Sequence, residues 1–163
     1  MSNNIIFIPG ISYNCDMFAP VVADLEREFK CYCFIAENPD IEDNLKALDL
    51  VCSSDFIIVA HSAFSGLALA YAAQYPGRVK KIVVFGACVH YLKDVAEFLR
   101  SGIEQIESGD SQDFKQAMRT SAMGDNCQNA TKVADSVIQM QSKTADAVLY
   151  AQVKYYLDNM DLT

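Results

Sequence analysis

The sequence has no tryptophan, only two histidines among its 163 residues, and fewer basic than acidic side chains. No apolar run approaches the ~20 residues that a membrane-spanning helix needs. No basic segment followed by an apolar stretch and a cleavage site stands near the start, so we expect no secretory signal. The net charge of −8 argues against nucleic acid or an anionic membrane surface as a partner.

The cysteines form no recognisable framework. No C-x-x-C pair occurs, and several of the six lie in apolar surroundings: Cys15, Cys31, Cys33, Cys52, Cys88 and Cys127. We therefore expect reduced thiols in a cytoplasmic protein. The two histidines and the scattered carboxylates have no metal-ligand spacing, so we expect neither a metal nor a cofactor.

The most informative stretch runs from Asp55 to Gly86. Residues 56–60 (FIIVA) form a short run rich in β-branched side chains, which predicts a strand buried on both faces. Residues 64–75 are mostly Ala and Leu and predict a helix, and residues 82–85 (IVVF) predict a second buried strand. This strand-helix-strand unit places Ser62 at the corner between strand and helix.

The segments before this unit continue the alternation. The apolar runs at 5–8 and 31–36 predict strands, and helical stripes predict helices over 18–30 and 41–51, the second with Asp40 as its N-cap. Alternation of this kind predicts a parallel sheet with helices on both faces. Dinucleotide-binding folds share it, but the first strand here is followed by PGISYN, not G-x-G-x-x-G, and no P-loop G-K-[S/T] occurs.

The corner at Ser62 resembles the nucleophile elbow of the α/β-hydrolase superfamily, G-x-S-x-G followed by an Ala/Leu helix and a Tyr-Pro stop. The match covers Ile58 to Ala87 and implies that Ser62 is a catalytic nucleophile. Ala60 and Phe64 replace the two glycines of the pattern; Ala60 adds only a methyl group, whereas Phe64 is harder to place in a tight turn. From the residues alone, Ser62 could instead simply cap the helix.

Pro9-Gly10-Ile11 resembles the His-Gly segment that ends the first central strand in this superfamily, with Pro in place of His. The resemblance implies that the N–H groups of Ile11 and Ala63 form an oxyanion hole. It also implies that the two segments meet at one crevice, through the strand order 31–36, 5–8, 56–60, 82–85. An ordinary Pro-Gly turn is the alternative for Pro9-Gly10.

Beyond residue 90, four helical apolar stripes follow one another without a strand, at 91–100, 111–123, 130–140 and 144–160. Gly102, Gly109 and Gly124 are expected to separate the first three. These helices resemble the cap of many α/β-hydrolases, and their Met, Phe and Tyr side chains could line an acyl pocket or simply pack. We therefore expect a three-layer parallel-sheet α/β-hydrolase-like core over 1–90, incomplete, and a helical cap over 91–163.

A general base and its orienting acid are the missing parts of a catalytic triad. In the superfamily they follow strands that come after the cap, and this sequence ends at Thr163. His61 precedes the expected nucleophile, where the superfamily often has a histidine that packs beside the sheet. His90 follows the strand at 82–85 and is the candidate for a substitute base, the alternative being an ordinary loop histidine.

Without further strands, the edge of strand 82–85 would be unpaired. Three explanations are open: the sequence is the front part of a longer hydrolase, which we favour; another chain, such as a second copy in a homo-oligomer, completes the sheet; or the cap helices cover the edge in a non-catalytic protein. We expect a serine hydrolase acting on a small ester, thioester or related acyl substrate. The alternative is a non-catalytic protein of this fold that binds a small apolar ligand or a protein partner.

Overall fold

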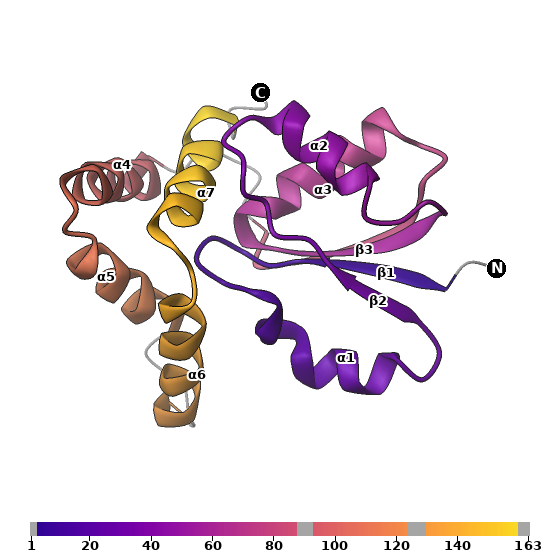
Figure 1. Cartoon of the computed structure of the whole chain (residues 1–163), viewed down its shortest axis with the longest axis horizontal. Coiled ribbons are helices and arrows are strands. Elements are labelled where there is room, and N and C mark those ends of the chain that lie inside the picture. Colours follow the sequence, from indigo (N-terminus) through magenta and orange to yellow (C-terminus); the bar gives the residue numbers. More distant parts are fainter. Residues whose placement is uncertain (1–2, 88–92, 124–129, 160–163) are drawn as a thin grey trace.

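The computed structural model describes residues 3–87, 93–123 and 130–159 and contains a parallel sheet between helices (Figure 1). Its strands are β1 (Asn4–Ile8), β2 (Lys30–Cys33), β3 (Phe56–His61) and β4 (Val79–Phe85). They lie in the order β2-β1-β3-β4, and all three pairings are parallel. The order expected from the sequence is therefore confirmed.

β1 is buried on both faces, and β3 is buried on one face and half-buried on the other, which suits uninterrupted apolar runs. On one face, Ile6 and Ile58 belong to a large core that includes side chains of α2 (Ile41–Asp49) and α3 (Ser65–Gln74). On the other face, Phe7 and Val59 pack in a smaller cluster with α1 (Ala19–Leu25). Figure 1 shows α1 on one side of the sheet and α2 and α3 on the other.

Two expected elements near the N-terminus are shorter than predicted. A 3₁₀ turn, η1 (Cys15–Phe18), leads into α1, which ends at Leu25 and not at residue 30, while β2 ends at Cys33 and not at residue 36. The helix stops early because the chain must turn into β2: the N–H of Lys30 donates to the carbonyl of Asn3 at 2.7 Å, a contact that a continuing helix would prevent. The N-cap predicted for α2 is confirmed, since Asp40 accepts a hydrogen bond from the N–H of Asp43.

Four helices lie together beyond the carboxyl ends of the strands, on the left in Figure 1. They are α4 (Lys93–Ser108), α5 (Gln112–Met123), α6 (Ala130–Ser142) and α7 (Asp146–Asn159), called the cap below. The expected break at Gly102 is wrong, because this residue lies inside α4, where a Cβ would come within 2.5 Å of Cζ of Phe114. Gly109, with φ of +80°, does follow the end of α4. Gly124 and the expected boundary at residues 90 and 91 lie outside the described residues.

The expectation that every cysteine is reduced is wrong at one pair. Cys15 and Cys33 form a disulfide between η1 and the end of β2, across 18 residues of chain. Pairing of β1 with β2 brings the two together, a proximity that their positions in the sequence do not reveal. Cys31 and Cys52 are free thiols, while Cys88 and Cys127 lie outside the described residues.

The outer edge of β4 pairs with no strand in the described part of the chain. Its apolar side chains are exposed: Val83 to 50%, Val84 to 40% and Phe85 to 39%. An unpaired apolar strand of this kind is the edge that the sequence led us to expect. Over the same described ranges, no helix has both the length and the apolar character needed to cross a bilayer.

Candidate functional site

Ser62 occupies a strained position at the carboxyl end of β3. It begins a short 3₁₀ turn, η2 (Ser62–Phe64), and has φ of +55°, a left-handed conformation that non-glycine residues seldom adopt. Such strain persists only where the surroundings fix it and is often found at functional sites. No side chain caps η2 or α3 with a hydrogen bond, so Ser62 does not serve as a helix cap.

The residues that replace the elbow glycines are both accommodated by burial. Ala60 and Phe64 have no exposed surface. The Phe64 ring packs against Tyr155 of α7, with ring centroids 5.1 Å apart. Phe64 therefore fills the space between the elbow and the cap and does not project across the turn.

The end of β1 lies against the elbow. A Cβ built on Gly10 would lie 2.7 Å from Nδ1 of His61 and 3.1 Å from Cβ of Ser62, so only glycine allows this approach. The N–H of Tyr13 donates to the carbonyl of Gly10 at 3.1 Å, which closes a turn over residues 10–13. This turn is called the oxyanion loop below, after the role that is proposed for it. The chain thus turns directly after Pro9, and Ile11 and Tyr13 of this turn line the hollow described next.

A hollow of about 430 Å³ opens between this corner and the cap. The core lines it with Ile11, Tyr13, His61, Ser62 and Ala63, and the cap lines it with Val95, Phe98, Leu99, Met118, Ser121 and Tyr156. In the described part of the chain, the N–H groups of Ile11 and Ala63 donate to no acceptor. Ser62 and the two residues that carry these N–H groups therefore border the same space.

His61 packs beside the site. Its ring stacks on Phe85 with centroids 4.8 Å apart and meets the Tyr13 ring edge-on at 5.6 Å. Nδ1 of His61 is buried without a hydrogen-bond partner among the described residues. Burial lowers the pKa of His61, and burial also raises the pKa of the Tyr13 phenol, so both rings are uncharged at neutral pH.

No described side chain is hydrogen-bonded to the Ser62 hydroxyl, so the structure identifies no base within the described ranges. His90, the candidate from the sequence, lies outside them. Sequence reasoning missed Tyr13 and Ser121 as lining residues, because neither belongs to a motif. It also missed the contacts that tie the oxyanion loop to the cap, which join residues more than a hundred positions apart.

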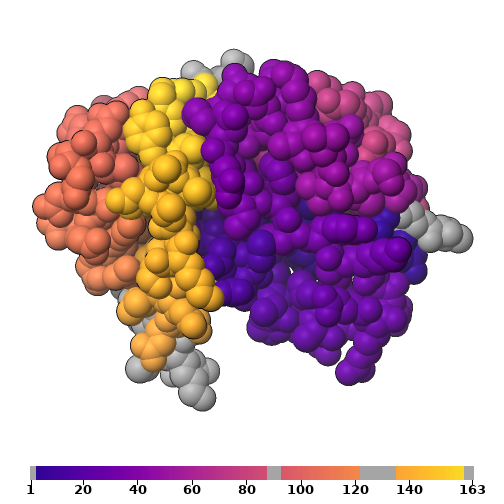
Figure 2. Space-filling view, viewed as in Figure 1, coloured from indigo at the N-terminus to yellow at the C-terminus, as the bar shows by residue number. Residues whose placement is uncertain are grey.

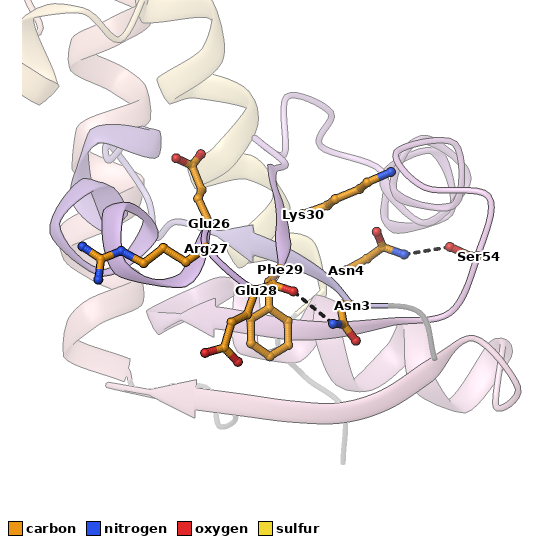
Figure 3. A pocket seen from close by; sticks show the side chains of 8 residues that line it. All are labelled: Asn3, Asn4, Glu26, Arg27, Glu28, Phe29, Lys30 and Ser54. Carbon is orange, nitrogen blue, oxygen red and sulfur yellow. Dashed lines mark hydrogen bonds between the residues drawn. The ribbon is translucent and has the colours of Figure 1, made fainter.

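A second hollow, of about 490 Å³, lies at the opposite end of the sheet (Figure 3). Asn4 Nδ2 donates to Ser54 Oγ at 2.7 Å, which ties the start of β1 to the turn before β3. The charged side chains of Glu26, Arg27 and Lys30 extend in different directions in Figure 3 and do not converge on one point. We therefore interpret this hollow as surface space beside the ends of the strands and not as a ligand site. No group of three potential metal ligands occurs among the residues described.

No family model matches the sequence, and no curated protein matches it either. The structure is similar to an esterase from Thermogutta terrifontis, with a TM-score of 0.80 and 13% identity over 97% of this chain and 64% of that one. It also matches an enol-lactonase from Burkholderia xenovorans LB400, with a TM-score of 0.77 and 12% identity over 97% and 66% of the two chains. A third match is MGS-M2, an alpha/beta hydrolase enzyme from a Medee basin deep-sea metagenome library, with a TM-score of 0.63 and 14% identity over 95% and 62%. The chain has part of the α/β-hydrolase fold.

That fold accounts for the strand order, the corner at Ser62 and the helices beyond the strand ends. The chain spans just under two thirds of the length of these α/β-hydrolase structures, 62 to 66%. Identities of 12 to 14% establish the fold and do not transfer residue roles.

Proposed function

We propose that this chain carries the nucleophile and the oxyanion hole of a serine hydrolase that acts on a small ester, thioester or related acyl substrate. One observation supports this above all: Ser62, at φ of +55°, lines the same hollow as Ile11 and Ala63. In this reaction a hydroxyl must reach a carbonyl carbon while backbone donors face its oxygen.

The proposed reaction has two steps. Ser62 Oγ attacks the carbonyl carbon, its proton passes to a base, and the negative oxygen accepts hydrogen bonds from Ile11 and Ala63, each contributing about 3 kcal/mol. The intermediate collapses to an acyl-serine, and the proton moves to the departing alkoxide or thiolate. Water then attacks the acyl carbon by the same route and restores Ser62. Since no described side chain is hydrogen-bonded to the hydroxyl, we assign the base to a group outside the described residues, with His90 as the candidate from this sequence.

The lining of the hollow favours an apolar acyl group. Its cap side is formed mainly by apolar and aromatic side chains from α4, α5 and α7, among them Phe98, Met118 and Tyr156. A volume of about 430 Å³ suits a small acyl chain. Burial of such a group would also exclude water from the carbonyl and strengthen the oxyanion contacts.

The second candidate function is binding of a small apolar ligand without turnover. It is favoured by one observation, that no described side chain is hydrogen-bonded to the Ser62 hydroxyl. Both candidates use the same hollow, so they differ only in whether Ser62 reacts.

A fluorophosphonate probe tests the proposal, with mass spectrometry to locate the label. We expect phosphonylation of the wild-type chain at Ser62 and none in Ser62→Ala. Ser121→Ala is the matched control, because Ser121 lines the same hollow, and it should be labelled like wild type. Equal labelling of Ser62→Ala and wild type rejects Ser62 as the nucleophile. Absence of label, together with saturable binding of an acyl amide, would favour the second candidate.

A further inference from the structure

The oxyanion loop is held by the cap, although the two are far apart in the sequence. Figure 2 shows the orange and yellow atoms of α6 and α7 lying directly against the indigo N-terminal segment. We propose that Gln152 and Gln141 are positioning residues that fix the oxyanion loop through Ser12, so that the geometry of the oxyanion hole depends on the cap. The inference rests on the proposed function for the role of the loop.

All three polar groups of Ser12 are engaged by the cap. Its N–H donates to Oε1 of Gln152 in α7 at 2.9 Å. Its hydroxyl accepts a hydrogen bond from Nε2 of Gln141 in α6, also at 2.9 Å. Its carbonyl accepts from the Thr144 hydroxyl at 3.3 Å, in the turn between these helices. The loop is therefore held by α6, α7 and the turn that joins them.

These contacts are shielded from water. Ser12 is 2% exposed, Gln141 is 1% exposed and Gln152 is fully buried. Nε2 of Gln152 has no partner among the described residues. An apolar side chain would fill the same space without burying an unpaired donor, so what the amide adds at this position is the contact of Oε1 with Ser12.

The backbone of Ser12 needs this support. Its φ of +67° lies in the left-handed region, which an L-residue leaves unless neighbouring groups hold it. Ile11 directly precedes it, so relaxation at Ser12 would reorient the Ile11 backbone. An oxyanion donor acts only when it is aimed at the developing charge.

The helices that hold the loop are linked to those that line the hollow. Arg119 of α5 donates from Nε to Oε1 of Gln141 at 2.9 Å, and α5 also contributes Met118 to the lining. α7 carries both Gln152 and the lining residue Tyr156. A substrate that packs against the cap side of the hollow would therefore also restrain the oxyanion loop.

Hydrogen–deuterium exchange tests the inference, because the amide of Ser12 is itself the donor to Gln152. In Gln152→Met, which keeps the size of the side chain and removes its acceptor, we expect exchange at residues 10–13 to rise about tenfold, with β1 and β3 unchanged. Fluorophosphonate labelling should slow about tenfold as well, since misplacement by about 1 Å costs up to a hundredfold in rate. Gln152→Glu retains an acceptor oxygen, is held in its protonated form by burial, and should restore both values.

Gln141→Met tests the second contact on a different helix and serves if Gln152→Met does not fold. Gln139→Met, at an exposed position of α6, is the matched control and should behave like wild type. A purely structural role would lower the melting temperature and leave loop exchange and labelling unchanged, and this result would overturn the inference. Raised exchange with an unchanged labelling rate would also overturn it. If the wild-type protein is not labelled by the fluorophosphonate, only the proposed function is rejected. Hydrogen–deuterium exchange at residues 10–13 would then still show whether the cap fixes the oxyanion loop.

Discussion

Gly10 and His61 are so close that a Cβ on Gly10 would lie 2.7 Å from Nδ1 of the histidine. Gly10 lies just beyond the end of β1, and His61 is the last residue of the neighbouring strand β3. This close approach brings the oxyanion loop against the elbow and gives the site its shape.

The substitution Gly10→Ala should therefore destabilise the protein. The new methyl group must push back the His61 ring and the Ser62 Cβ, and overpacking of this kind costs about 1 to 3 kcal/mol. Urea unfolding gives the free energy of unfolding. Gly77→Ala is the control, because nothing lies within 4 Å of a Cβ there, and it should change stability far less. Equal effects of the two substitutions would show that the strand ends are not in contact.

Phe64→Ala should lower the stability of the protein, although the superfamily has a glycine at this position. Phe64 is fully buried against Tyr155 of α7, and its removal leaves a cavity that costs about 3 to 5 kcal/mol. Leu69→Ala on α3, the helix that follows Phe64, is the control, because this side chain is 46% exposed. Thermal unfolding of the two variants measures the difference. A Phe64→Ala protein as stable as the control would mean that Phe64 is not the link between elbow and cap.

The disulfide between Cys15 and Cys33 should resist alkylation until the protein is reduced. Peptide mapping after alkylation in denaturant should find these two cysteines unalkylated, with their two peptides joined by the disulfide. Reduction, or Cys15→Ser, should lower the free energy of unfolding by about 3 kcal/mol, the loop-entropy value for a closed loop of this size. Cys31→Ser, which removes a free thiol, should have little effect. Alkylation of all six cysteines without reductant would contradict the pairing.

Stability should decrease on mild acidification because of His61. Burial lowers the pKa of His61 in the folded state, so the unfolded chain, with a histidine pKa of about 6.5, binds the proton more readily. The stability that neutral His61 contributes is therefore complete above about pH 6.5, and it is lost as the pH falls through and below that value. Denaturant unfolding at pH 7.5 and pH 5.5 should show a smaller drop for His61→Gln than for wild type. Identical drops would mean that another group causes the pH dependence.

The sheet was predictable because its strands carry a strong local signal. Runs such as IIFI in β1 and FIIVA in β3 are apolar throughout and rich in β-branched residues, which suits strands buried on both faces. The corner at Ser62 was found for the same reason: the composition changes there from buried strand to Ala-rich helix.

Features set by tertiary contacts were not predictable. Gly102 marks a helix break in the sequence, but in the fold it makes room for Phe114 of the next helix. Cys15 and Cys33 pair because β1 and β2 are neighbours. The contact of Ser12 with Gln152 spans 140 residues, and neither residue belongs to a motif.

A crystal structure of the phosphonylated protein would test whether one hydroxyl and two backbone donors serve a single reacting centre. We expect phosphorus on Oγ of Ser62 and one phosphonyl oxygen about 3 Å from the backbone nitrogens of both Ile11 and Ala63. A phosphonyl oxygen that points away from these nitrogens, or phosphorus bound to a different residue, would contradict the proposed site.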